Sequence, residues 1–144
     1  MKTKFNKKSR NLLIALLLGD GTISNNNVFK LSHGEKQKEY LEWKIKLLNE
    51  FGIKNNGIKE YISTKGYNLG KKVYYSQLSI IPFIKVLRRI FYKPKKIIGN
   101  RKLLNRLDAL GIAIWYMDDG HINKFFKNGK LTKFYIKIAT CLPK

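Results

Sequence analysis

Two short apolar segments, each ending in an Asp-Gly pair, constrain the fold of this chain more than any other feature. Residues 13–21 read LIALLLGDG, and residues 112–120 read IAIWYMDDG. The acids that close them, Asp20 and Asp119, stand about 100 residues apart, and similar segments at such a separation indicate an internal repeat. We therefore expect two equivalent helices, each ending at an acidic residue that is followed by a tight turn at glycine.

The first segment also looks like the front of a secretory signal peptide. Residues 1–10 carry five basic side chains and no acid, and an apolar stretch follows. A signal peptide, however, needs a small-residue cleavage site, which Gly19, Asp20 and Gly21 do not provide. A signal peptide also does not occur twice in one chain. We therefore interpret both segments as core helices and expect an intracellular protein, in the cytoplasm or an organelle matrix, that is not secreted.

Two such helices can pack side by side through small residues. These are Ala15 and Gly19 in the first helix and Gly111 and Ala113 in the second. Close packing would bring Asp20 and Asp119 together at the helix carboxyl ends, where carboxylates repel each other and the helix dipole disfavours them. Mg²⁺ or another divalent cation would compensate this charge. Alternatively, each Asp is an ordinary turn residue before glycine. Two matched copies favour the metal site.

Residue periodicity predicts an α/β (α+β) protein with the order helix–strand–strand–helix–strand–strand–helix, followed by a partial second repeat. Helices are expected over 35–51 and 82–92, and strands over 28–33, 57–63, 71–80, 121–126 and 133–139. The helix at 35–51 is expected to bury a stripe of Tyr40, Trp43, Leu47, Leu48 and Phe51. Trp43 and Trp115 are interpreted as core residues. His33 and His121 are expected at the surface.

The charge of the chain points to an anionic partner. Thirty basic residues against nine acids give a net charge of +21, which favours nucleic acid first and an anionic membrane surface second. No apolar stretch reaches the roughly 18 residues of a membrane span, so no membrane partner is expected. The single cysteine, Cys141, excludes an intrachain disulfide and a thiolate zinc site.

A basic hairpin is the candidate nucleic-acid surface. Residues 61–107 contain 12 basic residues and no acid, and a twisted hairpin with polar and aromatic side chains can enter the major groove of double-stranded DNA. At least one of Tyr74 and Tyr75 is expected to serve strand packing instead. The candidate DNA contacts are Lys59, Tyr61, Ser63, Lys65, Lys71, Lys72, Tyr75, Gln77 and Ser79.

The motifs LIALLLGDG and IAIWYMDDG resemble those of the LAGLIDADG homing endonucleases, in particular the single-chain, two-repeat branch encoded in group I introns. This resemblance implies an α/β fold of two pseudo-symmetric halves with the motif helices at their interface. It further implies metal-dependent, site-specific cleavage of double-stranded DNA, with Asp20 and Asp119 holding the metal. The segment KPKKIIG matches the position of the family's basic active-site residue, which assigns that role to Lys96.

Against this family pattern, residues 1–100 correspond to the first repeat and residues 101–144 to the start of a second, incomplete repeat. Either the gene product is truncated or another chain supplies the rest, as a complementing second half or a homodimer partner. Because a two-stranded ribbon is marginal without further packing, residues from about Asn123 onward are expected to be poorly ordered. The alternative function is that of a non-catalytic nucleic-acid-binding remnant or an RNA-splicing maturase.

Overall fold

The first motif segment folds into helix α1 (Lys7–Leu18), which lies at the centre of the hydrophobic core in the computed structural model. The Asn6 side chain caps this helix by accepting a hydrogen bond from the Ser9 backbone N–H. All residues from Leu12 to Leu18 are buried, because a helix that is apolar on every side requires cover on every side. The structure describes residues 6–79, 81–93, 96 and 101–138.

The remaining elements follow in the predicted order. After α1 come β1 (Thr22–Ile23), β2 (Phe29–Gly34), the 3₁₀ turn η1 (Glu35–Gln37), α2 (Lys38–Glu50), β3 (Lys59–Ile62), η2 (Gly66–Asn68), β4 (Lys72–Gln77) and α3 (Pro82–Phe91). They are followed by α4 (Arg101–Leu104), α5 (Ala109–Asp119), β5 (Gly120–Lys127) and β6 (Lys130–Ile138). The mixed α/β class is confirmed. The first predicted strand pair consists of β1 and β2. Of these two strands, only β2 corresponds to a predicted residue range, 28–33.

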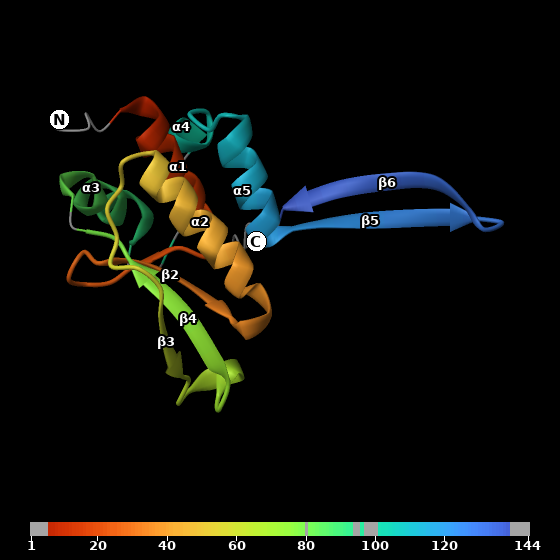
Figure 1. The fold of residues 1–144 in the computed structure, drawn as a ribbon. Coiled ribbons are helices and arrows are strands. Elements are labelled where there is room, and N and C mark those ends of the chain that lie inside the picture. Colours follow the sequence, from red (N-terminus) through yellow and green to blue (C-terminus); the bar gives the residue numbers. More distant parts are fainter. Residues whose placement is uncertain (1–5, 80, 94–95, 97–100, 139–144) are drawn as a thin grey trace.

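Strands β1 to β4 form one antiparallel sheet in the order β1-β2-β4-β3 (Figure 1). Residues alternate between its faces, so Phe29, Leu31 and Tyr74 point into the core and are buried. Helix α2 contacts β2 and β4. The opposite face carries the polar and aromatic residues Lys30 and Tyr75, each partly exposed. One face of the sheet is therefore closed by helices, and the other is available to a partner.

The second motif segment forms α5, which packs alongside α1 as the repeat predicts (Figure 1). Small residues line this contact, since the Ala15 Cβ lies 3.5 Å, an ordinary van der Waals distance, from the position that a Cβ on Gly111 would take. The same prediction is wrong for Ala113, which is exposed. Trp115 is buried, as expected. Among the described residues, no helix has the length and apolarity that crossing a membrane requires.

Gly19 is where the two motif helices meet most closely, and Gly19→Ala should destabilise the fold. An added Cβ would lie 2.6 Å from the Asp118 Cβ, closer than side-chain atoms approach. Overpacking of this kind costs about 1–3 kcal/mol, which a urea unfolding series would measure. Gly34→Ala is the matched control, because no atom lies within 4 Å of its added Cβ. Equal unfolding midpoints for the two variants would contradict this close packing.

The buried face of helix α2 overlaps the predicted stripe in part, because Leu48 is buried and Leu47 and Phe51 pack against the core as predicted. Its buried residues are Leu41, Lys44, Ile45 and Leu48, whereas Trp43 is 39% exposed and stacks on Tyr40. The prediction for Trp43 is therefore wrong. The physical reason is Lys44, which occupies the centre of the buried face although its side chain is charged. Because the prediction considered apolar residues alone, it placed the buried face of α2 on the side of the aromatic residues and not on the side of Lys44.

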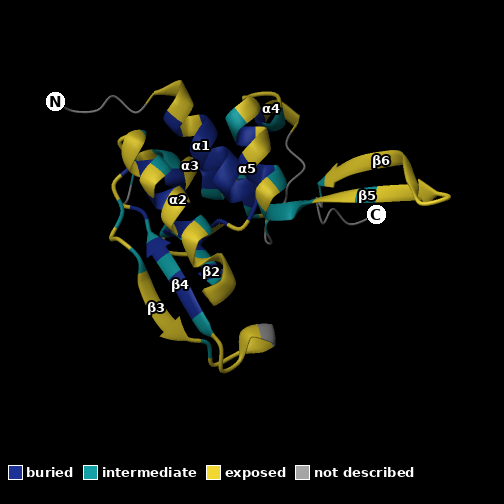
Figure 2. Cartoon of the chain, turned by 45° about the vertical axis from the view of Figure 1, so that its right-hand side comes forward, coloured by how far each residue is buried: buried dark blue, intermediate teal, exposed yellow. Residues whose placement is uncertain are grey.

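Strands β5 and β6 form a separate hairpin that extends away from the helices (Figure 1). The pairing is regular from Gly120–Ile138 to Lys127–Lys130, apart from one bulge at Phe125/Phe126. The expected disorder after Asn123 is therefore not what the structure shows, because the β-ladder itself continues to Ile138. The hairpin does lack further packing, as expected. Most of it is exposed (Figure 2), including the apolar side chains of Ile122, Phe126, Leu131, Phe134 and Ile136.

Candidate metal centre and basic sheet face

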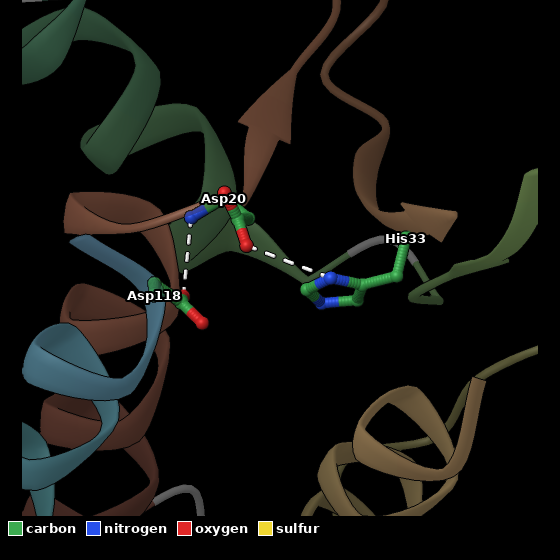
Figure 3. Close-up of side chains that lie close together, drawn as sticks. All are labelled: Asp20, His33 and Asp118. Carbon is green, nitrogen blue, oxygen red and sulfur yellow. Dashed lines mark hydrogen bonds and ion pairs between the residues drawn. The ribbon is translucent and has the colours of Figure 1, made fainter. Parts of the chain in front are cut away.

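The carboxyl ends of α1 and α5 meet through Asp118, which accepts a hydrogen bond from the Asp20 backbone N–H at 3.1 Å (Figure 3). The other Asp118 carboxylate oxygen, Oδ1, accepts from the Tyr40 hydroxyl at 2.8 Å and from Lys44 Nζ at 2.6 Å. The side chains of Lys44 and Asp118 are both fully buried. Asp118 thus ties α1, α2 and α5 together, and its oxygens are already occupied by protein donors.

His33 is part of this cluster, so the expectation of a surface histidine is wrong for it. His33 is only 4% exposed. Its Nδ1 lies 3.2 Å from Gln37 Oε1 and 3.6 Å from Asp20 Oδ2 (Figure 3), and its Nε2 lies 3.0 Å from Lys44 Nζ. His121, in contrast, is exposed as predicted.

Burial and nearby like charges raise the pKa values of the acids at this site. Burial raises the pKa of Asp20 above its usual value, and the charge of Asp118 raises it further, while Lys44, His33 and Lys96 act in the opposite direction. Burial also raises the pKa of Asp119, with additional contributions from the charges of Asp20 and Asp118. The three carboxylates therefore share one electrostatic site, in which the ionised forms of Asp20 and Asp119 are incompletely compensated.

Lys96 lies beside these acids. Its Nζ donates to the carbonyl oxygens of Gly19 and Gly21 at 2.7 and 2.9 Å, on either side of Asp20. Its positive charge opposes the rise in the pKa of Asp20 and of Asp119. The structure thus places the three sequence-predicted site residues in one region, whereas their roles stay predictions.

Lys44 makes His33 and Asp118 poor ligands for a divalent cation. Ligand atoms of Asp20, His33 and Asp118 do lie within 4.8 Å of one another. Asp118 and His33, however, both contact the ammonium group of Lys44, which repels a cation. The Asp20 side chain is 38% exposed, and hard cations such as Mg²⁺ prefer carboxylate oxygens and water.

The open face of the β1–β4 sheet carries an aromatic and basic cluster near this site. The Lys30 ammonium lies 4.9 Å from the Tyr61 ring centroid and 4.5 Å from that of Tyr75, and the two rings contact each other edge to face at 5.6 Å. Sheet register explains the cluster, because Ser32 and Lys59 both pair with Tyr75. We name Lys30, Ser32, Lys59, Tyr61, Tyr75 and Gln77 the open sheet face.

Most of the predicted DNA contacts lie on or beside the open sheet face. Ser63 and Lys65 belong to the exposed β3–β4 turn, where the Ser63 hydroxyl donates to the Lys65 carbonyl. Lys71 is exposed at the end of the same turn, and Ser79 is exposed after β4. Lys72 differs: it pairs with Ile62 on the opposite face of the sheet, and its ammonium lies 3.7 Å from Glu60. Tyr74 serves strand packing, as expected for one of the two tyrosines.

Comparisons with known proteins agree with this geometry. The sequence profile of the LAGLIDADG DNA endonuclease family matches residues 10–141. In fold, the chain is similar to the homing endonuclease I-WcaI bound to its DNA recognition sequence, with a TM-score of 0.63 and 22% identity. That match covers 87% of this chain and 55% of the other. The β1–β4 sheet, its helices and the paired motif helices thus form a LAGLIDADG homing endonuclease fold.

Curated relatives include two proteins named Protein RecA. The one from Mycobacterium shimoidei is 33% identical over 116 residues, and the one from Mycolicibacterium chitae is 31% identical over 117 residues. Each match covers 76% of this chain and 25% of the relative. Because the chain spans about a quarter of the length of these relatives, the activity for which they are named is not transferred to it.

Proposed function

Because the chain belongs to the LAGLIDADG DNA endonuclease family, we propose that it cleaves double-stranded DNA at a defined site in a reaction that depends on Mg²⁺ or another divalent cation. The observation that carries this proposal is the shared electrostatic site of Asp20 and Asp119 at the paired ends of α1 and α5. Two incompletely compensated carboxylates, with Lys96 beside them, match what a hydrolytic phosphodiesterase requires.

The proposed roles follow from the chemistry of each side chain. Asp20 and Asp119 hold the cation, which when bound lowers the pKa of a water molecule and stabilises charge on the scissile phosphate. Lys96 offsets negative charge at that phosphate. Asp118 keeps the two motif helices in register through the Asp20 N–H and is not itself proposed to hold the cation.

The open sheet face is proposed to lie against the DNA. Lysine and tyrosine side chains donate hydrogen bonds to phosphates and bases, and backbone contacts position the protein while base contacts specify the sequence. Lys30 was absent from the predicted contacts, yet it is central to the cluster. We therefore add Lys30 and Ser32 to the proposed contacts and remove Lys72, which faces Glu60.

A cleavage assay tests the proposal directly. Duplex DNA that spans the gene's own insertion site is incubated with the chain and Mg²⁺, with Ca²⁺ or with EDTA, and the ends are mapped. Cuts at one position that require Mg²⁺ would support the proposal. Binding of the same duplex with no cut under any of the three conditions would overturn it in favour of a non-catalytic nucleic-acid-binding protein. Binding to structured RNA in preference to DNA would favour a maturase.

Affinity for DNA should fall steeply with salt. A surface that makes roughly 6–10 phosphate contacts loses about 10³–10⁵-fold in affinity between 50 and 200 mM salt, because bound cations are released from the duplex. Lys30→Gln should weaken binding and reduce the slope of log K against log salt by about 1. Lys46→Gln, an exposed lysine on α2, is the control and should change neither. A flat salt dependence would contradict the proposed role of the open sheet face.

A further inference from the structure

The hydrogen-bond partners of His33 determine which of its ring nitrogens carries a proton. The Lys44 ammonium group lies 3.0 Å from Nε2, and an ammonium group has three donors and no acceptor. Lys44 is itself fixed, because its side chain is fully buried and Nζ also donates to Asp118 at 2.6 Å. The Nε2 atom of His33 must therefore be the acceptor, without a proton.

The other side of the ring shows the complementary arrangement. Nδ1 faces two oxygen atoms, Gln37 Oε1 at 3.2 Å and Asp20 Oδ2 at 3.6 Å. Both are acceptors, so a proton on Nδ1 satisfies both sides of the ring at once. The Tyr40 ring contacts the His33 ring at an interplanar angle of 61°, with 5.3 Å between the ring centroids, and this contact limits rotation that would exchange the two nitrogens.

We propose that His33 is a positioning residue that donates from Nδ1 to Gln37 Oε1 at 3.2 Å and so holds its Nδ1–H edge 3.6 Å from Asp20 Oδ2, and that Lys44 fixes this tautomer from the opposite side of the ring. It follows that His33 is not a metal ligand: Nε2 is occupied by Lys44, and Nδ1 carries the proton. His33 and Asp118 then support Asp20, and these three residues do not form a three-ligand metal site. This inference rests on the proposed function only for its catalytic consequence; the tautomer can be tested without it.

Nitrogen NMR of the intact chain tests the tautomer. The chain has two histidines, so the two-bond ¹H–¹⁵N spectrum of a labelled sample contains two ring systems, and His121→Asn assigns them. We expect His33 near pH 7 to show a protonated Nδ1 and an unprotonated Nε2, before and after addition of Mg²⁺. A protonated Nε2, or loss of the Nδ1 proton on addition of Mg²⁺, would overturn the proposal.

A paired variant tests the role of Lys44. Lys44→Met combined with Asp118→Asn removes both buried charges together, so that neither is left without its partner. Without the ammonium donor, His33 should populate the Nε2–H form in the same spectrum. If His33 keeps its proton on Nδ1 alone, then Lys44 does not fix the tautomer and that part of the proposal is wrong.

Two replacements of His33 test its effect on Asp20. The amide N–H of His33→Asn stands near the position of Nδ1–H, whereas the longer side chain of His33→Gln reaches toward Lys44. We expect His33→Gln to lower the cleavage rate about 10–100-fold, His33→Asn to lower it less, and DNA affinity to change little in both. The reverse order, or equal rates in both variants, would overturn the proposal. If the variants do not fold, the wild-type spectrum decides alone.

The experiments separate this inference from the proposed function. A chain that holds the proton of His33 on Nδ1 but cuts no DNA would support the tautomer and overturn the nuclease proposal. A chain that cuts DNA with a protonated Nε2 would support the nuclease and overturn the role of His33.

Discussion

Asp20→Asn and Asp119→Asn are each expected to reduce DNA cleavage by about 10³-fold or more, because a bound cation supplies several kcal/mol of transition-state stabilisation. DNA affinity should stay the same or rise, since each substitution removes a negative charge next to the proposed phosphate position. Asn keeps the size and the hydrogen-bond acceptor of Asp, so the packing of α1 against α5 is retained. Single-turnover cleavage and a binding titration on the same duplex measure the two effects separately.

Glu42→Gln is the matched control for these variants, because Glu42 is an exposed acid on α2 that pairs with Lys38 at 3.7 Å. It should cut DNA at the parental rate. Loss of cleavage that is confined to Asp20→Asn, with Asp119→Asn fully active, would show that the two motif acids do not act together. Full activity in both would remove the metal site from the proposal altogether.

The helices and strands follow from sequence patterns because burial in this chain has a regular period. The two motif helices carry long apolar runs, and the residues of β2 alternate between buried and partly exposed positions. Pro82 stands in the first turn of α3, as its missing N–H allows. The position of the β5–β6 hairpin could not be predicted in the same way. Its strands pair with each other, and its apolar side chains are exposed apart from Ile138, which packs against the core.

The supporting residues of the site were harder to predict, although one signal was present. His33 follows Phe29 and Leu31 at two-residue steps in β2, and this alternation places it on the core face. Lys44 stands between Leu41 and Leu48 at helical spacing, on the buried face of α2. Residue type outweighed position in both cases, because a basic side chain is rarely found inside a protein. The pairing with Asp118 explains the exception, and it connects residues too far apart in the sequence for any local pattern to reveal.

Lys44→Met is expected to lower the free energy of unfolding by about 3–5 kcal/mol, which is the usual effect of leaving a buried charge without its partner. Methionine fills the volume of the lysine stem, so the loss reflects charge and not a cavity. Asp118 would then retain the Asp20 N–H and the Tyr40 hydroxyl as donors but would lack a positive partner at Lys44. Urea unfolding followed by tryptophan fluorescence reports the change, since Trp115 is buried beside this cluster on α5.

The double variant Lys44→Met, Asp118→Asn decides whether charge is the cause. Removing both members of a buried pair is often close to neutral, whereas removing one is not, so the double variant should regain most of the lost stability. The double-mutant cycle isolates the interaction because the two side chains are in direct contact at 2.6 Å. Losses that simply add would mean that Lys44 supports the fold through packing. In that case the buried cluster would not explain why a lysine stands at the centre of the core face of α2.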